Sequence, residues 1–298
     1  MIVNWNTRDL LAECLRSIDR TVRSTDELSV EVWVVDNAST DDSVAMVRSQ
    51  FSWAKLIKNT KNVGFAAANN QAIHIASGRY IVLLNSDTVV HAGALATLVM
   101  FMERTPRAGA CGPRLLNADG SLQHACHPML TPGREFWRLL FLERIWPRAT
   151  YPLEAWGAVQ PRQVEAIKGA SLLLRRAALV QVGLLDESYF MYTEEVDLCH
   201  RLHRAGWDLW YVPQAVVTHF GEGSSRQMAE TMYVQLYRSK LQFYRKFGGD
   251  RQARLAKLFY ALAYTPRWLA AAGMAGLRPE YAARARTYRR LLADLPAM

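Results

Sequence analysis

Short apolar runs that end in polar residues alternate, over the first hundred residues, with segments whose apolar positions recur every three or four residues. The runs at residues 1–6, 30–36, 54–58 and 79–90 are typical of strands buried on both faces. The segments between them have the spacing of amphipathic helices. This β-α-β-α order predicts right-handed crossovers and an α/β fold with a mostly parallel sheet of Rossmann-like type, flanked by helices.

The rest of the chain continues this pattern and then changes character. We expect further strands at residues 108–112, 164–174, 208–212 and 215–219, and helices at residues 93–104 and 194–205. Residues 134–151 combine arginines with aromatic side chains and could form an amphipathic helix or a mobile flap. We predict a catalytic α/β domain over residues 1–223 and a helical, basic and aromatic C-terminal region over residues 224–298.

The composition of the chain limits which classes of protein it could belong to. The chain has 298 residues, of which 50% are hydrophobic and 21% charged, so it can bury a core. The net charge of +9 predicts an anionic partner such as nucleic acid, anionic lipid or a phosphorylated small molecule. The four cysteines are far apart, which predicts neither a disulfide framework nor a zinc site. With neither a signal-peptide pattern nor a membrane-spanning apolar run, we expect a cytoplasmic or surface-bound protein.

Polar side chains follow three of the predicted strands. They are Asn4 and Asn6 after the first, Asp36 and Asn37 after the second, and Asn85, Ser86 and Asp87 after the fourth. The carboxyl ends of parallel strands meet at one edge of a sheet, where open α/β sheets bind their ligands. A carboxylate beside an amide and a hydroxyl suits a hard divalent cation that holds a diphosphate. The glycine-rich patterns of dinucleotide-binding and P-loop proteins are absent, so we do not predict a nicotinamide enzyme.

Two later positions carry candidate chemistry. Glu194 and Glu195 open a predicted helix, where they could complement the helix dipole or act as a general base toward a hydroxyl. Arg201 follows Asp197 by one helical turn, which favours a structural ion pair. His219 ends a predicted strand and could complete a metal site.

Taken together, these residues resemble the inverting family-2 glycosyltransferases of the GT-A fold. The bacterial rhamnosyltransferase-like enzymes of cell-wall and surface polysaccharide synthesis are the most similar subgroup. The resembling segments are, in chain order, residues 3–6, 34–41, 62–66 with Asn69 and Asn70, 84–87, 112–114 with Asp119 and Gly120, 168–171, 190–198, and His219 with Ser224.

The resemblance implies roles for individual residues. Asn4, Asn6, Asp36 and Asn37 would hold the nucleoside, and Asn62, Phe65, Asn70, Asn85 and Ser86 would shape the donor site. Asp87 would bind Mg²⁺ or Mn²⁺ on the donor diphosphate, with His219 as a further ligand. The second member of the acidic pair is the base in this family, which implies Glu195, and Glu194 is the alternative. Gly169 and Arg201 are further candidates.

The resemblance also implies substrates. The donor would be a dTDP-, UDP- or GDP-linked sugar, with dTDP-rhamnose as the subgroup's choice, and the acceptor a glycan or polyprenyl-linked glycan. The Gln-x-x-Arg-Trp signature of processive synthases is absent, which favours single sugar additions. Family members carry more apolar residues in their first strand, so we expect a short strand here.

Two rival functions remain open. A sugar nucleotidyltransferase could use the same cleft and would release pyrophosphate. A non-catalytic sugar-nucleotide-binding protein with a degenerate site would bind the donor without reaction. The set formed by Asp87, Glu195 and His219 favours catalysis over the second rival.

Basic and aromatic residues alternate beyond Arg238, among them Lys240, Arg245, Phe243 and Tyr244. This composition is typical of a helix at an anionic membrane surface, and equally of a helical cap whose aromatic side chains pack on a core. Membrane contact would place the protein on the inner face of the plasma membrane. The region contains no nucleic-acid-binding module, so we do not expect a nucleic acid partner.

Overall fold

The computed structural model describes residues 1–23, 28–146, 149–221 and 228–298. The chain divides into two compact units. The first comprises residues 1–129, 152–190 and 194–227, and the second residues 130–151, 191–193 and 228–298. The domain boundary that we expected between residues 223 and 224, and the candidate residue Ser224, lie outside the described residues.

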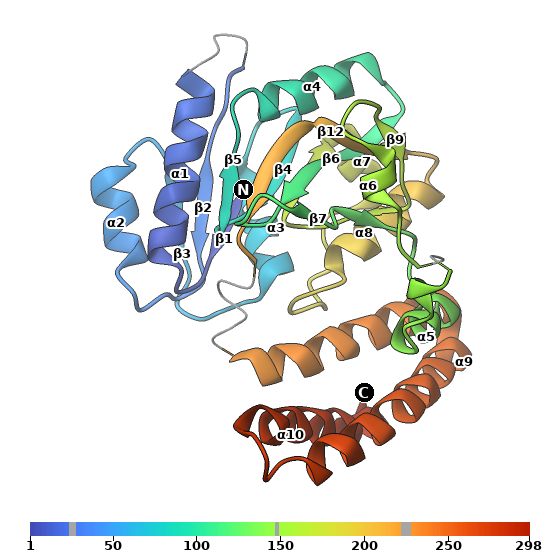
Figure 1. Ribbon diagram of the computed structural model, residues 1–298. Coiled ribbons are helices and arrows are strands. Elements are labelled where there is room, and N and C mark those ends of the chain that lie inside the picture. The colour runs from blue at the N-terminus through green and yellow to red at the C-terminus, as the bar shows by residue number, and fades with distance from the viewer. Residues whose placement is uncertain (24–27, 147–148, 222–227) are drawn as a thin grey trace. The chain divides into compact units, whose positions relative to one another are not determined.

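The first unit is built on a mixed sheet with helices on both faces (Figure 1). Its strands follow the order β3-β2-β1-β4-β11-β6-β12-β5, with β7 beside β6 and β9 beside β12. The strands are β1 (Ile2–Asn4), β2 (Trp33–Asp36), β3 (Lys55–Lys58), β4 (Tyr80–Asn85), β5 (Thr88–Val90), β6 (Ala108–Leu116), β7 (Leu122–Gln123), β9 (Arg162–Gln163), β11 (Ser171–Arg175) and β12 (Asp208–His219). A separate pair joins β8 (Cys126–His127) to β10 (Ala166–Ile167).

The helices of this unit are α1 (Arg8–Arg23), α2 (Ser43–Gln50), α3 (Phe65–Ile75), α4 (Ala94–Arg104), α6 (Leu153–Trp156), α7 (Arg176–Val182) and α8 (Glu194–Arg204). Small side chains let α3 approach the sheet, since Ala68 and Ala72 pack against Val35 of β2. Val34, the neighbour of Val35 on the same strand, is also fully buried. Because successive side chains of a strand point to opposite faces, β2 is covered on both sides, as its unbroken apolar run predicted.

The strand register gathers the polar ends of the strands. β1 runs parallel to β2 and β4, β2 runs parallel to β3, and Asn4 lies opposite Asp36. Val3 lies opposite Asn85, so the carboxyl end of β4 is at the same edge. The predicted α/β fold class is therefore confirmed, and β11 and β5 are the antiparallel members of the sheet's main path.

Two predicted strands are each divided. The run at residues 79–90 forms β4 and β5, which join different neighbours on either side of the turn at Ser86 and Asp87. The run at residues 164–174 forms β10 and β11, interrupted at residues 168–170. The polar residues 85–87 marked the first break in the sequence, whereas periodicity did not reveal the second, because both halves of that run are apolar enough to be buried.

The second unit is helical. It contains α5 (Pro132–Leu139), η1 (Leu142–Arg144), α9 (Ala229–Gly273), α10 (Pro279–Asp294) and η3 (Leu295–Ala297). Both α5 and α10 pack on α9. Gly249 has φ of 70°, a left-handed conformation that breaks α9 into two helical halves.

A polar cluster lies inside this helical unit. Lys240 donates to Glu135 across 2.9 Å, and Arg138 donates to the same carboxylate across 2.8 Å. Tyr237, Tyr244 and Tyr260 are buried in the same unit. Lys240 and these tyrosines therefore belong to the unit's core, as the helical-cap interpretation of the sequence proposed for the aromatic side chains.

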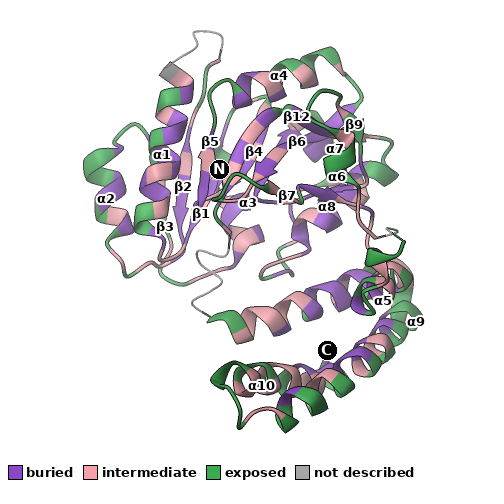
Figure 2. Ribbon diagram, in the orientation of Figure 1, coloured by how far each residue is buried: buried purple, intermediate pink, exposed green. Residues whose placement is uncertain are grey.

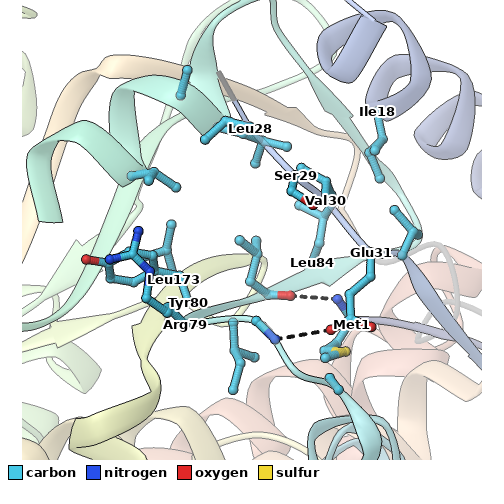
Figure 3. Close-up of a pocket in the computed structure, with 18 of the residues that line it drawn as sticks. Met1, Ile18, Leu28, Ser29, Val30, Glu31, Arg79, Tyr80, Leu84 and Leu173 are labelled. Atoms are coloured by element: carbon cyan, nitrogen blue, oxygen red, sulfur yellow. Dashed lines mark hydrogen bonds between the residues drawn. The ribbon is translucent and has the colours of Figure 1, made fainter. Parts of the chain in front are cut away.

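A cavity of about 1020 Å³ lies at the amino-terminal ends of β1, β2 and β4 (Figure 3). Met1, Val32 and Val82 contribute to its lining, together with Ile18 of α1 and Leu95 of α4. The Met1 ammonium donates to the Val82 carbonyl across 2.7 Å, and burial lowers its pKa to about 6. Since Asn4, Asp36 and Asn85 are at the opposite, carboxyl ends of these strands, this cavity is distinct from the predicted donor site.

Candidate active site

Hydrogen bonds connect the polar ends of β1, β2 and β4. The Asn4 amide nitrogen donates to Asp36 Oδ1 across 3.0 Å, and the Thr7 hydroxyl donates to Asn4 Oδ1 across 2.7 Å. The Thr7 oxygen also lies 2.8 Å from the Ser86 hydroxyl. The structure therefore brings the three predicted strand ends into one network, and it adds Thr7, which the sequence analysis did not select.

The loops beyond these ends have an unusual backbone. Asn6 and Ala38 have φ of 51° and 64°, in the left-handed region that side chains other than glycine rarely occupy. Hydrogen bonds hold the two loops together. Ser39 Oγ accepts from the backbone N–H of Asn6 at 3.0 Å, and Asn6 Oδ1 accepts from the backbone N–H of Thr40 at 2.7 Å. Such conformations persist where the surroundings enforce them and cluster at functional sites.

A second cluster joins Asp87 to His219. The imidazole Nε2 of His219 lies 3.3 Å from Asp87 Oδ1 and 3.3 Å from the Asn85 amide nitrogen. Both Asp87 and His219 are buried. The antiparallel register of β5 and β12, in which His219 lies opposite Thr88, brings the two side chains together.

Gln123 fixes the proton on His219. The Gln123 carbonyl oxygen lies 2.7 Å from His219 Nδ1 and accepts from Lys168 Nζ at 3.1 Å. An oxygen that accepts from a lysine accepts from the imidazole as well, so the network assigns the proton to Nδ1 and leaves the Nε2 lone pair facing Asp87. A second hydrogen bond of this kind orients metal-binding histidines.

Glu194 and Glu195 begin α8, and their environments differ. Glu194 is 4% exposed, and burial together with the neighbouring Glu195 raises its pKa well above the ordinary value. The Oε2 atoms of both glutamates have no hydrogen-bond partner among the described residues. Burial also raises the pKa of Glu195, but backbone N–H groups, including that of Gly169, and the Lys168 ammonium oppose the rise. Of the two, Glu195 is the carboxylate whose charged form has more donors around it, since a single backbone N–H opposes the rise for Glu194.

The predicted candidate Gly169 lies against Glu195. A side-chain carbon at position 169 would meet Cβ and Cγ of Glu195 at 3.5 Å. Because Lys168 also bonds to Gln123, the segment at residues 168–169 links the histidine cluster to Glu195. The first unit thus places Asp87, His219 and Glu195 along one connected set of side chains and backbone.

Other predicted residues have structural partners. The Asn37 amide donates to the Gly64 carbonyl at 3.1 Å, and Asn62 Oδ1 accepts from the Gly64 amide at 3.0 Å. Gly64 has φ of 86°, and an added Cβ would lie 2.4 Å from the Phe190 carbonyl, so glycine is required there. The Phe65 amide donates to this same carbonyl at 2.8 Å.

Two further candidates fix loops. The Asn70 amide donates to the Leu185 carbonyl at 2.8 Å and to Glu187 at 2.9 Å. Arg201 pairs with Asp197 at 2.6 Å, as its spacing predicted, and donates to the carbonyls of Val182 and Leu184, where α7 ends. Both side chains therefore hold the segment that leads to Glu194 and Glu195.

Asp87 and His219 are the pair best suited to a cation. Carboxylate oxygen and imidazole nitrogen both bind Mn²⁺, and the Nε2 lone pair already faces Asp87. Within the ranges that the structure describes, no group of three or more histidine, cysteine, aspartate or glutamate residues could hold a metal. A cation here would therefore take its remaining ligands from substrate and water, as Mg²⁺ commonly does with phosphates.

Two family profiles match the sequence. The profile described as Glycosyl transferase family 2 matches residues 1–145, and that described as Glycosyl transferase family group 2 matches residues 80–282. The chain belongs to glycosyltransferase family 2. The resemblance seen in the motifs is thereby confirmed, and the protein is a glycosyltransferase.

Characterised relatives of this family-2 glycosyltransferase include rhamnosyltransferases. It is 34% identical over 208 residues to the N-acetylglucosaminyl-diphospho-decaprenol L-rhamnosyltransferase of Mycobacterium tuberculosis, covering 65% of this chain and 67% of the relative. It is 28% identical over 170 residues to the rhamnosyltransferase WbbL of Escherichia coli, covering 55% of this chain and 63% of the relative. These relatives confirm the rhamnosyltransferase-like assignment.

Solved structures confirm the GT-A fold of the glycosyltransferase. GalNAc-T7 with UDP, GalNAc and Mn²⁺ matches with a TM-score of 0.57 at 16% identity, over 73% of this chain and 42% of that one. The mannosyltransferase PcManGT from Pyrobaculum calidifontis with GDP-Man and Mn²⁺ matches with a TM-score of 0.55 at 18% identity, over 98% of this chain and 84% of that one.

Among the helices in the described part of this family-2 enzyme, none is long and apolar enough to cross a membrane.

Proposed function

We propose that this glycosyltransferase moves a sugar, with inversion, from a nucleoside-diphosphate donor to a hydroxyl of a lipid-linked glycan during cell-wall or surface polysaccharide synthesis. The observation that carries this proposal is the connected network from Asp36, through Ser86, to the turn that bears Asp87, together with the link from His219 through Lys168 to Glu195. It supports nucleoside binding at one end and proton removal at the other.

Each part of the network has a task in this mechanism. Asp36, oriented by Asn4 and by the Ser39 amide at 3.0 Å, would accept a hydrogen bond from the nucleoside. Asp87 and His219 would hold Mg²⁺ or Mn²⁺, and the bound cation would supply positive charge beside the departing diphosphate. Glu195 would take the proton of the acceptor hydroxyl, because a carboxylate with a raised pKa is a better base at neutral pH.

The proposed transfer takes place in a single displacement step. The acceptor oxygen forms a bond to the anomeric carbon while the bond from that carbon to the diphosphate oxygen breaks on the opposite face. The proton goes to Glu195 and the electron pair leaves with the nucleoside diphosphate. The anomeric configuration inverts, and no covalent enzyme intermediate is needed.

The rhamnosyltransferase relatives support the choice of substrates. The mycobacterial relative is named for L-rhamnosyl transfer to N-acetylglucosaminyl-diphospho-decaprenol. We infer a dTDP-linked rhamnose donor and a polyprenyl-diphosphate acceptor that begins with N-acetylglucosamine. Residues 1–223 would form the catalytic domain, and the enzyme would work at the inner face of the plasma membrane, adding one sugar at each encounter.

A product assay tests this function. The protein is incubated with Mn²⁺, a synthetic N-acetylglucosaminyl-diphosphoryl-lipid and, in separate reactions, dTDP-rhamnose, UDP-N-acetylglucosamine and GDP-mannose. We expect dTDP release that depends on the acceptor, with a product of inverted anomeric configuration in the NMR spectrum. In a separate reaction with dTTP and rhamnose 1-phosphate, release of pyrophosphate would identify a nucleotidyltransferase. Donor binding without any product, with every donor and acceptor, would point to a non-catalytic binding protein.

A further inference from the structure

The charge of the protein is concentrated in its C-terminal part. Residues 228–298 contain thirteen lysines and arginines and four acidic residues, a net charge of +9. The whole chain also has a net charge of +9, so residues 1–227 have none. The attraction of the protein to anions therefore arises in the helical C-terminal region.

The second half of α9 exposes a stripe of leucines. Leu255, Leu258, Leu262 and Leu269 are 43%, 53%, 57% and 57% exposed. Their spacing of three, four and seven residues places them on one side of a helix. Figure 2 shows exposed residues along this part of α9. We call these four residues the leucine stripe.

The opposite side of the same helix is already packed. Ala253, Ala256, Tyr260, Ala263 and Tyr264 are buried, and their positions lie about half a turn away from the leucine stripe. The tyrosine hydroxyls of Tyr233 and Tyr264 bond to each other within the unit. The leucines are therefore not part of the core of the helical unit. They are also not the aromatic residues from which the sequence suggested a membrane contact.

Cations border the leucine stripe. Arg251 and Arg254 are exposed in the first turn after the break at Gly249, and Lys257 is half-buried one turn later. Residues 251–273 contain no aspartate or glutamate. Asp250, the acidic residue just before this helix half, pairs with Arg245 at 3.3 Å.

We propose that the leucine stripe docks on an anionic lipid bilayer. Leucines at one side of a helix enter the boundary between headgroups and acyl chains, and neighbouring arginines bind lipid phosphates. A second copy of the chain fits less well, because the cations beside one stripe would face those of the other. Thr265 and Pro266 also interrupt the apolar repeat that a helix pair would need.

Vesicle binding tests this surface without requiring catalysis. The full-length protein is sedimented with vesicles of phosphatidylcholine alone, or of phosphatidylcholine and phosphatidylglycerol in equal parts. We expect binding to the anionic vesicles that weakens as salt is added, since salt screens exposed charges. A water-soluble acceptor analogue should react equally well with and without vesicles.

Paired variants locate the contact. Leu258→Ser with Leu262→Ser should lower the vesicle partition coefficient about ten-fold or more, and Arg251→Gln with Arg254→Gln should remove most of the preference for anionic vesicles. Ile75→Ser with Val180→Ser is the matched control, because Ile75 and Val180 are 55% and 81% exposed in the other unit. Unchanged unfolding midpoints establish that all the variants fold.

Three results would overturn the proposal. The first is that the protein fails to bind anionic vesicles. The second is that the leucine variant binds these vesicles as well as the wild type and the control variant do. The third is a dimer in light scattering that Leu258→Ser with Leu262→Ser converts to monomer, which would identify the stripe as a contact between copies of the chain.

Discussion

The Nε2 atom of His219 lies 3.3 Å from Oδ1 of Asp87. The two side chains are far apart in the sequence, and the antiparallel pair of β5 and β12 holds them together. The hydrogen bond between His219 Nδ1 and Gln123 leaves the Nε2 lone pair directed toward the carboxylate. This geometry suits a cation with two protein ligands and several ligands from a diphosphate.

Removing either proposed metal ligand should weaken metal-dependent donor binding. For Asp87→Ala and for His219→Ala, we expect the affinity for dTDP in the presence of Mn²⁺ to fall about ten-fold to 100-fold or more, because loss of an outer-shell partner alone costs a metal site about this much. Isothermal titration with and without Mn²⁺ measures the change. His91→Ala is the matched control, since His91 bonds to Thr218 on the same pair of strands but is exposed.

The same titration can refute the metal assignment. If Asp87→Ala kept the wild-type response to Mn²⁺, the cation would have to bind elsewhere. If His219→Ala alone kept it, Asp87 and substrate would suffice, and His219 would act only through Asn85.

Substitutions of Glu194 and of Glu195 should have different effects on kcat. Glu195→Gln should lower kcat about 100-fold to 10,000-fold with little change in donor KM, because the base acts on the acceptor proton rather than on the donor. Glu194→Gln should retain substantial activity if Glu195 is the base. The opposite ranking would transfer the role to Glu194.

The raised pKa of Glu195 also predicts the pH dependence of activity. A base must be deprotonated, so kcat should fall as the pH drops through a pKa that lies above the ordinary value of 4.5 for glutamate. A pH profile of kcat between pH 4.5 and 8 measures this fall. A profile flat down to pH 4.5 would contradict the burial of the base.

Glu194 should make the protein less stable at neutral than at mildly acidic pH. Because its pKa in the folded state is raised above the unfolded value, the folded state binds the extra proton, and the free energy of unfolding decreases as the pH rises from 4.5 through the folded pKa. Each unit of pKa difference corresponds to about 1.4 kcal/mol. Urea titrations at several pH values should show a smaller decrease for Glu194→Gln.

The buried ion cluster of the helical unit should be sensitive to loss of one partner. Lys240→Met leaves the Glu135 carboxylate, which is 3% exposed, with Arg138 as its remaining cation among the described contacts, and should lower the unfolding free energy by about 3 kcal/mol. Urea denaturation measures the loss. Lys246→Met, on the exposed side of the same helix, should change stability little.

The stability of this buried ion cluster at low pH provides a second test. Burial opposes ionisation of Glu135, but Lys240 and Arg138 outweigh it and lower its pKa. The stabilisation is therefore present above pH 4.5 and lost as the pH falls through the lowered pKa. Lys240→Met should reduce this acid sensitivity, and an unchanged acid transition would show that Arg138 alone sustains it.

Local pattern predicted much of the fold and the main candidate residues. The apolar runs located β1 to β4, and the polar residues that end β1, β2 and β4 share one edge because parallel pairing aligns strand ends. The pairing of Arg201 with Asp197 followed from helical spacing alone. These features depend on neighbours in sequence or on one general rule of sheet geometry.

Residues that act through distant partners were harder to find. Gln123 is in a two-residue strand with no pattern of its own, and only the folded sheet shows that it bonds to both His219 and Lys168. Thr7 was not selected from the sequence, and only the folded sheet shows that its hydroxyl bonds to Ser86 as well as to Asn4. The aromatic side chains beyond Arg238 suggested a membrane contact by composition, but burial shows that Tyr244 and Tyr260 belong to the core and that leucines face outward.

The position of Asp87 directly before the edge strand β5, with His219 on the neighbouring β12, has a consequence for motion. β5 has three residues, and in the strand order of the sheet it ends the series beside β12. Short edge strands open more readily than central ones, so their amide hydrogens exchange early. A cation that bridged Asp87 and His219 would hold both strands closed at this point. Slower hydrogen exchange at residues 88–90 on addition of Mn²⁺ and dTDP would thus report loading of the site from the backbone itself.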